Sequence, residues 1–305
     1  MTRRIEVREA HAATEPGPFA RIAITGFGLI GGSIGLAIKR RWPSSLVIAI
    51  DQKHVLEAAM RVHAADVGGD TLVMAGDADL VILAAPVLQN IALLDQLPEY
   101  LPTGAVVTDV GSTKRLIVAA ADANASLTFI GGHPMSGAAS GGFAAARPDM
   151  FDGRPWILTP RPSSGQAPAV VPAALEKLEA FITGVGAVPR IMTADLHDRL
   201  VGAVSHLPQI TASALMHVVG TLAGDAGLEL AGPGLLDTTR LASSPPEIWR
   251  DIAASNEDVL RDALDALIKT MTELRASLGD GEKIESVFTS ASRWREALVR
   301  ARGEQ

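Results

Sequence analysis

The sequence predicts an α/β fold with a doubly wound parallel sheet, followed by a domain built only of helices. Three observations lead to this prediction. Short apolar runs alternate with helical stretches up to about residue 190, which is typical of a parallel sheet with helices on both faces. A glycine-rich turn follows the first apolar run. Beyond Thr193 the alternation stops, and only helical periodicity remains.

Each expected strand of the first domain is an apolar run bounded by a turn signal or a helical stretch. These runs are RIAIT (21–25), LVIAI (46–50), DLVILAA (79–85), GAVVTDVG (104–111) and LTFIGG (127–132). The first leads into glycines and then into LIGGSIGLAIKRR, which has helical spacing. A second helix is expected from Lys53 to about Ala65, and the third run ends at Pro86.

The second domain is expected to be helical throughout. Its clearest helix spans 255–278, where seven apolar residues from Leu260 to Leu278 fall on one stripe, and another is expected over 283–302. The Pro- and Ser-rich stretch 159–172 is interpreted as a surface loop, and VGAVPRIM (185–192) as the hinge. The expected organisation is therefore a loose extension (1–18), a nucleotide-binding domain (19–190) and a helical domain (191–305).

Composition excludes several classes of protein. The formal net charge is −7, whereas a nucleic-acid-binding protein is expected to carry a basic face. No apolar run approaches the roughly 18 residues of a membrane span, and the N-terminus lacks the apolar core of a secretory signal. The chain has no cysteine, which excludes disulfides and thiolate chemistry. We expect a cytoplasmic protein without a metal site, bound to neither nucleic acid nor membrane.

The glycine-rich turn GFGLIG has the spacing of a dinucleotide-binding site of the Rossmann type. In such a site the first glycine permits the tight turn, the second lets the backbone approach a pyrophosphate, and the third lets helix and strand pack closely. The predicted cofactor site comprises Gly26, Gly28, Leu29, Ile30, Gly31 and Asp51.

Asp51 decides the predicted cofactor. It follows Gly31 by 20 residues, where an acid binds the adenosine ribose hydroxyls. A carboxylate repels a 2′-phosphate, so NAD is favoured over NADP, although Lys53 nearby could meet a phosphate. The alternative interpretation is that Asp51 merely ends a strand in solvent.

Two further segments follow strand ends, where open α/β sheets bind ligands. DVGSTK (109–114) places Ser112 there, and GGHPMSG (131–137) places His133 in a glycine-lined turn. A neutral imidazole can accept an alcohol proton while a hydride leaves the same carbon. Ser112 could orient the alcohol or the nicotinamide amide. His133 could instead be an ordinary hydrogen-bonded turn histidine.

These motifs carry a family resemblance. GFGLIGGSIGLAIK, DVGSTK and GGHPMSG, with SHLPQ (205–209) and LLDTTRLASSPPEIWRDI (235–252), resemble the prephenate and arogenate dehydrogenases in order and spacing. The resemblance covers nearly the whole chain from Phe19. It implies oxidative decarboxylation of a cyclohexadienyl acid with NAD, on the route to tyrosine.

The resemblance also implies roles for individual residues. His133 and Ser112 would act on the ring hydroxyl, and Arg240 would bind a substrate carboxylate. His206 would lie in the substrate pocket, with Gln209 at the end that meets the substrate side chain. Trp249 would reach the neighbouring subunit's site, because the family's helical domains form the homodimer.

The sequence departs from the family near the substrate side chain. The positions after the HP-x-x-G turn, 138–142, are small and neutral where the family often has an acid and a base. Leu236 stands where a lysine is common, and Gln209 where a histidine often follows the proline. No acid is then nearby to meet an ammonium group, which favours prephenate; arogenate remains the alternative substrate.

Three other functions compete with this interpretation. An amine analogue, 4-amino-4-deoxyprephenate, is distinguished poorly by the sequence. The β-hydroxyacid dehydrogenases resemble one another in using a lysine on the second domain's first helix. No lysine occurs between Lys177 and Lys269 in this sequence, which nearly excludes that class. A dinucleotide-sensing protein on the same fold is the non-enzyme alternative.

Overall fold

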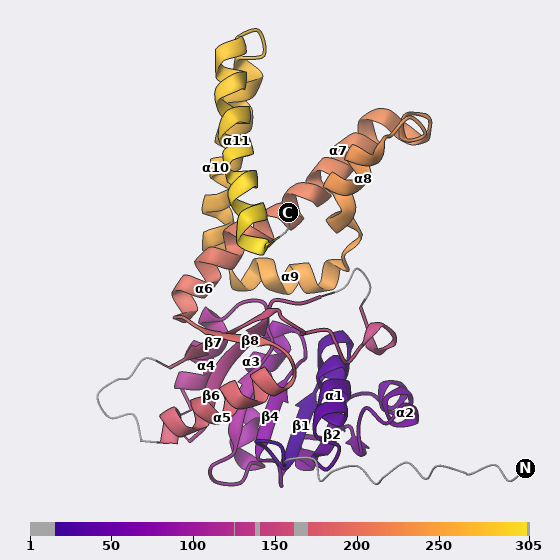
Figure 1. Cartoon of the computed structure of the whole chain (residues 1–305), viewed down its shortest axis with the longest axis vertical. Helices are drawn as coiled ribbons and strands as arrows, with labels where there is room; N and C mark the ends of the chain where they lie inside the picture. Colours follow the sequence, from indigo (N-terminus) through magenta and orange to yellow (C-terminus); the bar gives the residue numbers. More distant parts are fainter. Residues whose placement is uncertain (1–15, 125, 138–140, 162–169, 304–305) are drawn as a thin grey trace, which may run out of the picture. The chain divides into compact units, whose positions relative to one another are not determined.

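The structure is a computed structural model that describes residues 16–124, 126–137, 141–161 and 170–303 (Figure 1). The chain divides into two compact units, Met1–Glu257 and Asp258–Gln305. The first unit holds the sheet, the helices around it and several of the later helices. Most of the expected N-terminal extension (1–18) lies outside the described residues.

The first unit contains one eight-stranded sheet in the order β3-β2-β1-β4-β5-β6-β7-β8. All neighbouring pairs are parallel except β6 and β7. The strands are β1 Arg21–Thr25, β2 Leu46–Ile50, β3 Val67–Gly69, β4 Leu80–Leu83, β5 Val106–Asp109, β6 Thr128–Pro134, β7 Pro155–Pro160 and β8 Val188–Ile191. The five predicted strands are present, and the prediction of a doubly wound, mainly parallel sheet is confirmed.

Two apolar layers cover the two faces of the sheet. Alternate residues of β1 enter different layers: Ile22 and Ile24 pack into one, and Ala23 packs into the other, as expected of a strand whose side chains point to opposite faces. Buried residues of α1 and α5 belong to the first layer, and those of α3 and α4 to the second. The helices are α1 Leu29–Arg41, α2 Lys53–Arg61, α3 Val87–Gln96, α4 Arg115–Asp122 and α5 Val170–Gly184.

Three strands escaped prediction, and one of them corrects the expected hinge. Residues 188–191 form β8, an edge strand paired with β7, so 185–192 is not a simple connector. Thr159 and Pro160, expected in a loop, end β7. β8 is largely exposed and contains a proline, and β3 is only three residues long. Neither therefore shows the apolar run from which a strand is recognised.

The rest of the described chain is helical, as predicted. In the first unit the helices are α6 Ala194–Val201, the π-helical turn η4 Gly202–His206, α7 Leu207–Leu228, α8 Pro233–Thr239, the 3₁₀ turn η5 Arg240–Ser243 and α9 Pro246–Ser255. α6 packs against α4, and α9 packs against α3. The second unit consists mainly of α10 Glu257–Ala276 and α11 Gly281–Arg302. None of the described helices is both long and apolar enough to cross a membrane.

The carboxyl ends of the parallel strands lie in register, which places the predicted motifs at one edge of the sheet. Thr25 of β1 pairs with both Ile50 of β2 and Leu83 of β4, and Leu83 pairs in turn with Asp109 of β5. The glycine-rich turn, Asp51 and the DVGSTK segment therefore begin at the same edge.

Candidate active site

The glycine-rich turn has the geometry that its three glycines predict. Gly26 has φ +84°, and a Cβ atom there would lie 2.6 Å from the backbone of Ala84 and Ala85. A Cβ on Gly31 would lie 2.0 Å from the carbonyl oxygen of Gly26. At Gly28 a Cβ would meet no atom within 4 Å. Gly26 and Gly31 are thus required by the protein itself, whereas the space at Gly28 is left for another molecule.

Asp51 joins the end of β2 to this turn. Its Oδ2 accepts a hydrogen bond from the backbone N–H of Phe27 at 2.5 Å, and its Oδ1 accepts one from Gln52 at 2.6 Å. Leu29 and Ile30 open helix α1 beside it and are half-buried. The free N–H groups of a helix N-terminus favour phosphate oxygens. Turn, carboxylate and helix end together fit a dinucleotide.

A buried ion pair fixes the next two segments of this edge. The Lys114 ammonium contacts the Asp109 carboxylate, and both side chains are fully buried. Lys114 Nζ also donates to the carbonyl oxygen of Gly132 at 2.7 Å, while Asp109 accepts from the backbone N–H groups of Gly111 and Gly132. Burial lowers the pKa of Lys114, and the neighbouring Asp109 opposes that effect. The pair therefore ties the DVGSTK segment to the residue before His133.

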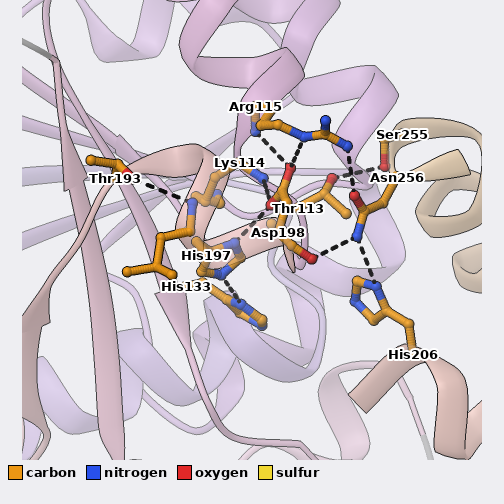
Figure 2. Close-up of polar contacts among 12 residues, drawn as sticks. Thr113, Lys114, Arg115, His133, Thr193, His197, Asp198, His206, Ser255 and Asn256 are labelled. Atoms are coloured by element: carbon orange, nitrogen blue, oxygen red, sulfur yellow. Dashed lines mark hydrogen bonds and ion pairs between the residues drawn. The ribbon is translucent and has the colours of Figure 1, made fainter. Parts of the chain in front are cut away.

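His133 is the first member of a buried chain of three side chains (Figure 2). Its Nδ1 lies 2.8 Å from Nε2 of His197, and Nδ1 of His197 lies 2.8 Å from Oδ1 of Asp198. Backbone N–H groups of Lys114 and Arg115 also donate to Asp198, at 2.6 and 2.9 Å. Helix α6 supplies both new members, and Thr193 caps its first turn.

The pKa shifts determine where the protons lie along the hydrogen-bonded series of Asp198, His197 and His133. Burial would raise the pKa of Asp198, but hydrogen bonds from His197 and two backbone N–H groups outweigh it and hold that pKa below its ordinary value. Burial lowers the pKa of His197 and lowers that of His133 well below 6.5. Both imidazoles are therefore neutral near pH 7, and Asp198 is ionised.

Only one placement of the protons allows both hydrogen bonds, from His133 to His197 and from His197 to Asp198, to form between two neutral imidazoles and an ionised carboxylate. An ionised carboxylate accepts, so Nδ1 of His197 carries the proton and its Nε2 has the lone pair. That lone pair accepts from Nδ1–H of His133, which leaves Nε2 of His133 unprotonated. Nε2 of His133 forms no hydrogen bond with the described residues. The chain thus presents one imidazole nitrogen as a ready proton acceptor.

Ser255 and Asn256, at the end of α9, form hydrogen bonds with the residues of this site. Thr113 lies 2.8 Å from Ser255 Oγ. Asn256 accepts from Arg115 at 2.9 Å and donates to the carbonyl oxygen of Asp198 at 3.0 Å. Ser112, beside Thr113, is half-buried, and its hydroxyl forms no hydrogen bond with the described residues. Ser112 is therefore held in place by its neighbours while its own hydroxyl remains available.

His206 lies beside this network at the end of the π-helical turn. Burial lowers its pKa to about 4, so the ring is neutral. Its Nδ1 lies 3.4 Å from Nδ2 of Asn256, an amide nitrogen that can only donate. The proton therefore sits on Nε2, which is buried without a partner in the described part of the chain. Trp249 of the same chain packs edge-on against this ring, with centroids 5.9 Å apart.

Gln209 lies in the first turn of α7, and Arg240 lies in the turn η5. Gln209 is buried and donates to the carbonyl oxygen of Leu241 at 2.6 Å. Arg240 opens the turn η5 and is exposed, and its guanidinium has neither an ion pair nor a hydrogen bond with the described residues. In particular, no ion pair joins it to Asp237 within the described chain.

Sequence reasoning missed His197, Asp198 and Asn256. The adjacent His and Asp of DLHD were a visible signal, but nothing in the sequence pairs them with a histidine 64 positions earlier. Asn256 follows a helix end, where a polar residue is ordinary. No cluster of three His, Cys, Asp or Glu side chains suited to a metal occurs within the described ranges.

Comparison with protein families matches both parts of the chain. Residues 34–188 match the family model described as prephenate dehydrogenase, nucleotide-binding domain, and residues 193–289 match prephenate dehydrogenase, dimerization domain. The prephenate dehydrogenase of Bacillus subtilis is 34% identical over 286 residues, which cover 91% of this chain and 76% of that protein.

Solved structures give the same result. A prephenate dehydrogenase from Aquifex aeolicus, in complex with hydroxyphenyl propionate and NAD⁺, is 26% identical with a TM-score of 0.81, covering 91% of this chain and 98% of that one. Arogenate dehydrogenase from Synechocystis is 28% identical with a TM-score of 0.75, covering 92% and 100%.

Proposed function

This chain belongs to the prephenate dehydrogenase family, and we propose that it converts prephenate and NAD⁺ to 4-hydroxyphenylpyruvate, carbon dioxide and NADH. One observation carries the proposal: the chain from Asp198 through His197 leaves Nε2 of His133 as an unprotonated acceptor at the edge where the dinucleotide turn lies. The reaction removes a hydride from a carbon whose hydroxyl needs such an acceptor.

NAD is the cofactor that the residues fit. The open space at Gly28 admits a pyrophosphate, and the N-terminus of α1 with Leu29, Ile30 and Gly31 faces its charge. Asp51 is placed to bind the adenosine ribose hydroxyls and to repel a 2′-phosphate. The nearby Lys53 side chain is 91% exposed and lies 3.9 Å from Glu57. When bound, NAD⁺ supplies a hydride acceptor at its nicotinamide ring.

His133 manages the proton of the substrate hydroxyl. As the ring carbinol becomes a carbonyl, its oxygen gains positive charge, and Nε2 of His133 accepts the proton or a strong hydrogen bond from it. Loss of the ring carboxylate as carbon dioxide then aromatises the ring, and the proton returns to the phenolic oxygen. The overall reaction therefore releases no net proton. Ser112, with its hydroxyl free, orients the substrate hydroxyl or the nicotinamide amide.

His197 and Asp198 act through His133 as positioning residues. Asp198 fixes the proton on Nδ1 of His197, and His197 in turn fixes the proton on Nδ1 of His133. Without these two residues the His133 ring could carry its proton on Nε2, where it cannot accept another. Such partners of a reactive imidazole commonly contribute about 10- to 100-fold to activity at metal-bound histidines, and we expect a similar contribution here.

Arg240, His206, Trp249 and Gln209 form the proposed substrate-binding set. Arg240 offers a guanidinium that has no ion pair with the described residues and can bind a carboxylate through two parallel hydrogen bonds. His206 offers a buried Nε2–H donor that lacks a protein partner in the described chain. Trp249 packs against the His206 ring in an edge-to-face contact. Gln209 contributes from α7, through its hydrogen bond to Leu241 in the turn that carries Arg240.

Arogenate is the second candidate substrate, because the chain also resembles the arogenate dehydrogenase of Synechocystis. Purified protein should be mixed with prephenate or arogenate, each with NAD⁺ or NADP⁺, while the absorbance of the reduced cofactor is followed. Faster NADH formation from prephenate supports the proposal, and faster formation from arogenate reassigns the substrate. No reduction in any of the four mixtures would refute dehydrogenation of both acids and favour the amine analogue or a sensor.

The active form is proposed to be a homodimer. The match to the family's dimerization domain supports this, and so do the exposed apolar side chains of α7, Leu215, Val218 and Leu222, whose spacing puts them on one helix face. Light scattering should give twice the chain mass. Leu222→Glu should weaken the dimer, whereas Val73→Glu, an exposed residue of the first domain, should not. A monomeric wild type would contradict the proposal.

A further inference from the structure

Gln209 directs its amide toward the turn that carries Arg240. Its Nε2 donates to the carbonyl oxygen of Leu241 at 2.6 Å, and its Oε1 accepts from Oγ of Ser244 at 3.2 Å. Nε2 also lies 3.4 Å from Oγ of Ser213, one turn further along α7. Both ends of a side chain that is only 6% exposed are therefore engaged within this chain.

A carboxamide suits these two partners better than other side chains do. A carbonyl oxygen can only accept, so the Leu241 contact fixes which end of the amide is the donor. The other end then accepts from the Ser244 hydroxyl. A glutamate here would set a carboxylate against a carbonyl oxygen, and a methionine of similar length would remove one of the two donors to that partly buried oxygen.

The turn held by these bonds is short. η5 contains four residues between α8 and α9, and Arg240 is the first of them. Inside the turn, the backbone N–H of Ser244 donates to Leu241 at 3.1 Å, and Ser243 Oγ donates weakly to Arg240 at 3.4 Å. The Gln209 bonds thus tie the start of α7 to the backbone of Leu241 within the turn and to the side chain of Ser244 just after it.

We propose that Gln209 is a positioning residue for Arg240, holding the backbone from which the guanidinium reaches the substrate carboxylate. The inference rests on the proposed carboxylate role of Arg240. Gln209 also follows His206 by one helical turn. The start of α7 therefore sets two substrate contacts at once, His206 directly and Arg240 through the turn.

The test uses Gln209→Met in the full-length enzyme, with Gln96→Met as the control. Gln96 is exposed and donates only to Ala92 of its own helix. Gln209→Met should raise the KM for prephenate about tenfold, the order expected from the loss of one hydrogen bond to a partly buried acceptor. The kcat and the KM for NAD⁺ should change less than about twofold, and Gln96→Met should match the wild type throughout.

A double-mutant cycle separates positioning from general damage. Once Arg240→Ala has removed the guanidinium, Gln209→Met should have no further effect on the KM for prephenate. An equal rise with and without Arg240 would overturn the proposal, and so would a fall in kcat with an unchanged KM. Should Gln209→Met fail to fold, Ser244→Ala removes one of the two bonds. It should show a smaller rise in the same KM and the same dependence on Arg240.

Hydrogen exchange keeps the inference separate from the proposed function. Gln209→Met should speed amide exchange at residues 240–244 while leaving strand β5 unchanged, whatever the substrate is. If the wild type reduces NAD⁺ with neither acid, the proposed function fails. The exchange result still tests whether Gln209 stabilises residues 240–244. Unchanged exchange at 240–244 would overturn the inference even in an active enzyme.

Discussion

The Nδ1 atom of His133 lies 2.8 Å from Nε2 of His197, although the two residues are 64 positions apart. One comes from the end of strand β6 and the other from the first helix after the sheet. Because Asp198 orients His197 from its far side, the contact assigns a proton to each ring. The sheet thus supplies the reactive histidine, and α6 supplies the groups that set its protonation.

His133→Asn should remove the proton acceptor and leave the nucleotide turn intact. We expect kcat to fall by about 10²- to 10⁴-fold, the range for loss of a positioned general base. NAD⁺ affinity, measured by fluorescence titration, should change little. A comparable loss of NAD⁺ affinity would show that His133 serves the cofactor instead.

Asp198→Asn should disturb the proton arrangement without removing either histidine. The amide can donate to Nδ1 of His197, which moves the His197 proton to its Nε2. His197 would then donate to Nδ1 of His133, and the His133 proton would lie on Nε2. We expect kcat to fall by about 10- to 100-fold, with a smaller effect on the KM for NAD⁺. Asp195→Asn, an exposed change on the same helix, should retain full activity. Equal rates for these two variants would exclude the positioning role, provided that thermal melting shows both folded.

The buried histidines should make stability depend on pH. Unfolded histidine has a pKa of about 6.5, whereas burial lowers that of His206 to about 4 and also lowers those of His133 and His197. Below pH 6.5 the unfolded chain therefore binds protons that the folded chain does not. The free energy of unfolding should be highest above pH 6.5 and fall toward pH 4, by up to roughly 1.4 kcal/mol per pH unit for each such group.

Urea unfolding at pH 7.5, 6 and 5 measures this dependence. His206→Gln should reduce the slope between pH 6 and 5, whereas the exposed His217→Gln should leave it unchanged. A wild-type stability that is constant over this range would contradict the neutral state assigned to the three rings.

Two glycines of the nucleotide turn should respond differently to alanine. Gly31→Ala places a methyl group 2.0 Å from a backbone oxygen, so it should lower stability by more than about 1 kcal/mol, as overpacking does. At Gly28 the methyl group would meet no protein atom within 4 Å, so the loss of stability should be smaller.

For Gly28→Ala the main loss should fall on the cofactor. Its KM for NAD⁺ should rise at least about tenfold, because the methyl group fills the space required for the pyrophosphate. Chemical denaturation and initial-rate kinetics distinguish the two variants. Undiminished NAD⁺ binding by Gly28→Ala would mean that the cofactor does not pass this turn.

The sequence predicted best where structure depends on neighbours along the chain. The strand RIAIT, the turn GFGLIG and the helix after them form one continuous segment, and each was correctly expected at 21–41. Strand β8 was missed because it is exposed and contains Pro189. It forms a strand because β7 is available for pairing, and a partner elsewhere in the chain leaves no local pattern.

The same distinction applies to the site. The residue types of Gly26, Gly28, Gly31 and Asp51 already indicate a nucleotide, because one continuous strand–helix–strand unit, residues 21–51, brings them together. The sequence also identified His133 as a candidate base, from its place after a strand. It did not indicate the roles of His197 and Asp198 or the hydrogen bond from Gln209 to Leu241.

The sequence by itself determined five of the eight strands and their order along the chain, the nucleotide turn and the residue types available for chemistry. Tertiary structure alone decided which of those residues meet and which protons they carry. Periodicity reports which side of an element is buried but does not identify the surface that buries it. The contacts of His133 with His197, and of Thr113 with Ser255 142 positions away, depend on how whole elements pack. The lowered pKa of His133 follows from that packing, because burial sets the cost of charging the ring.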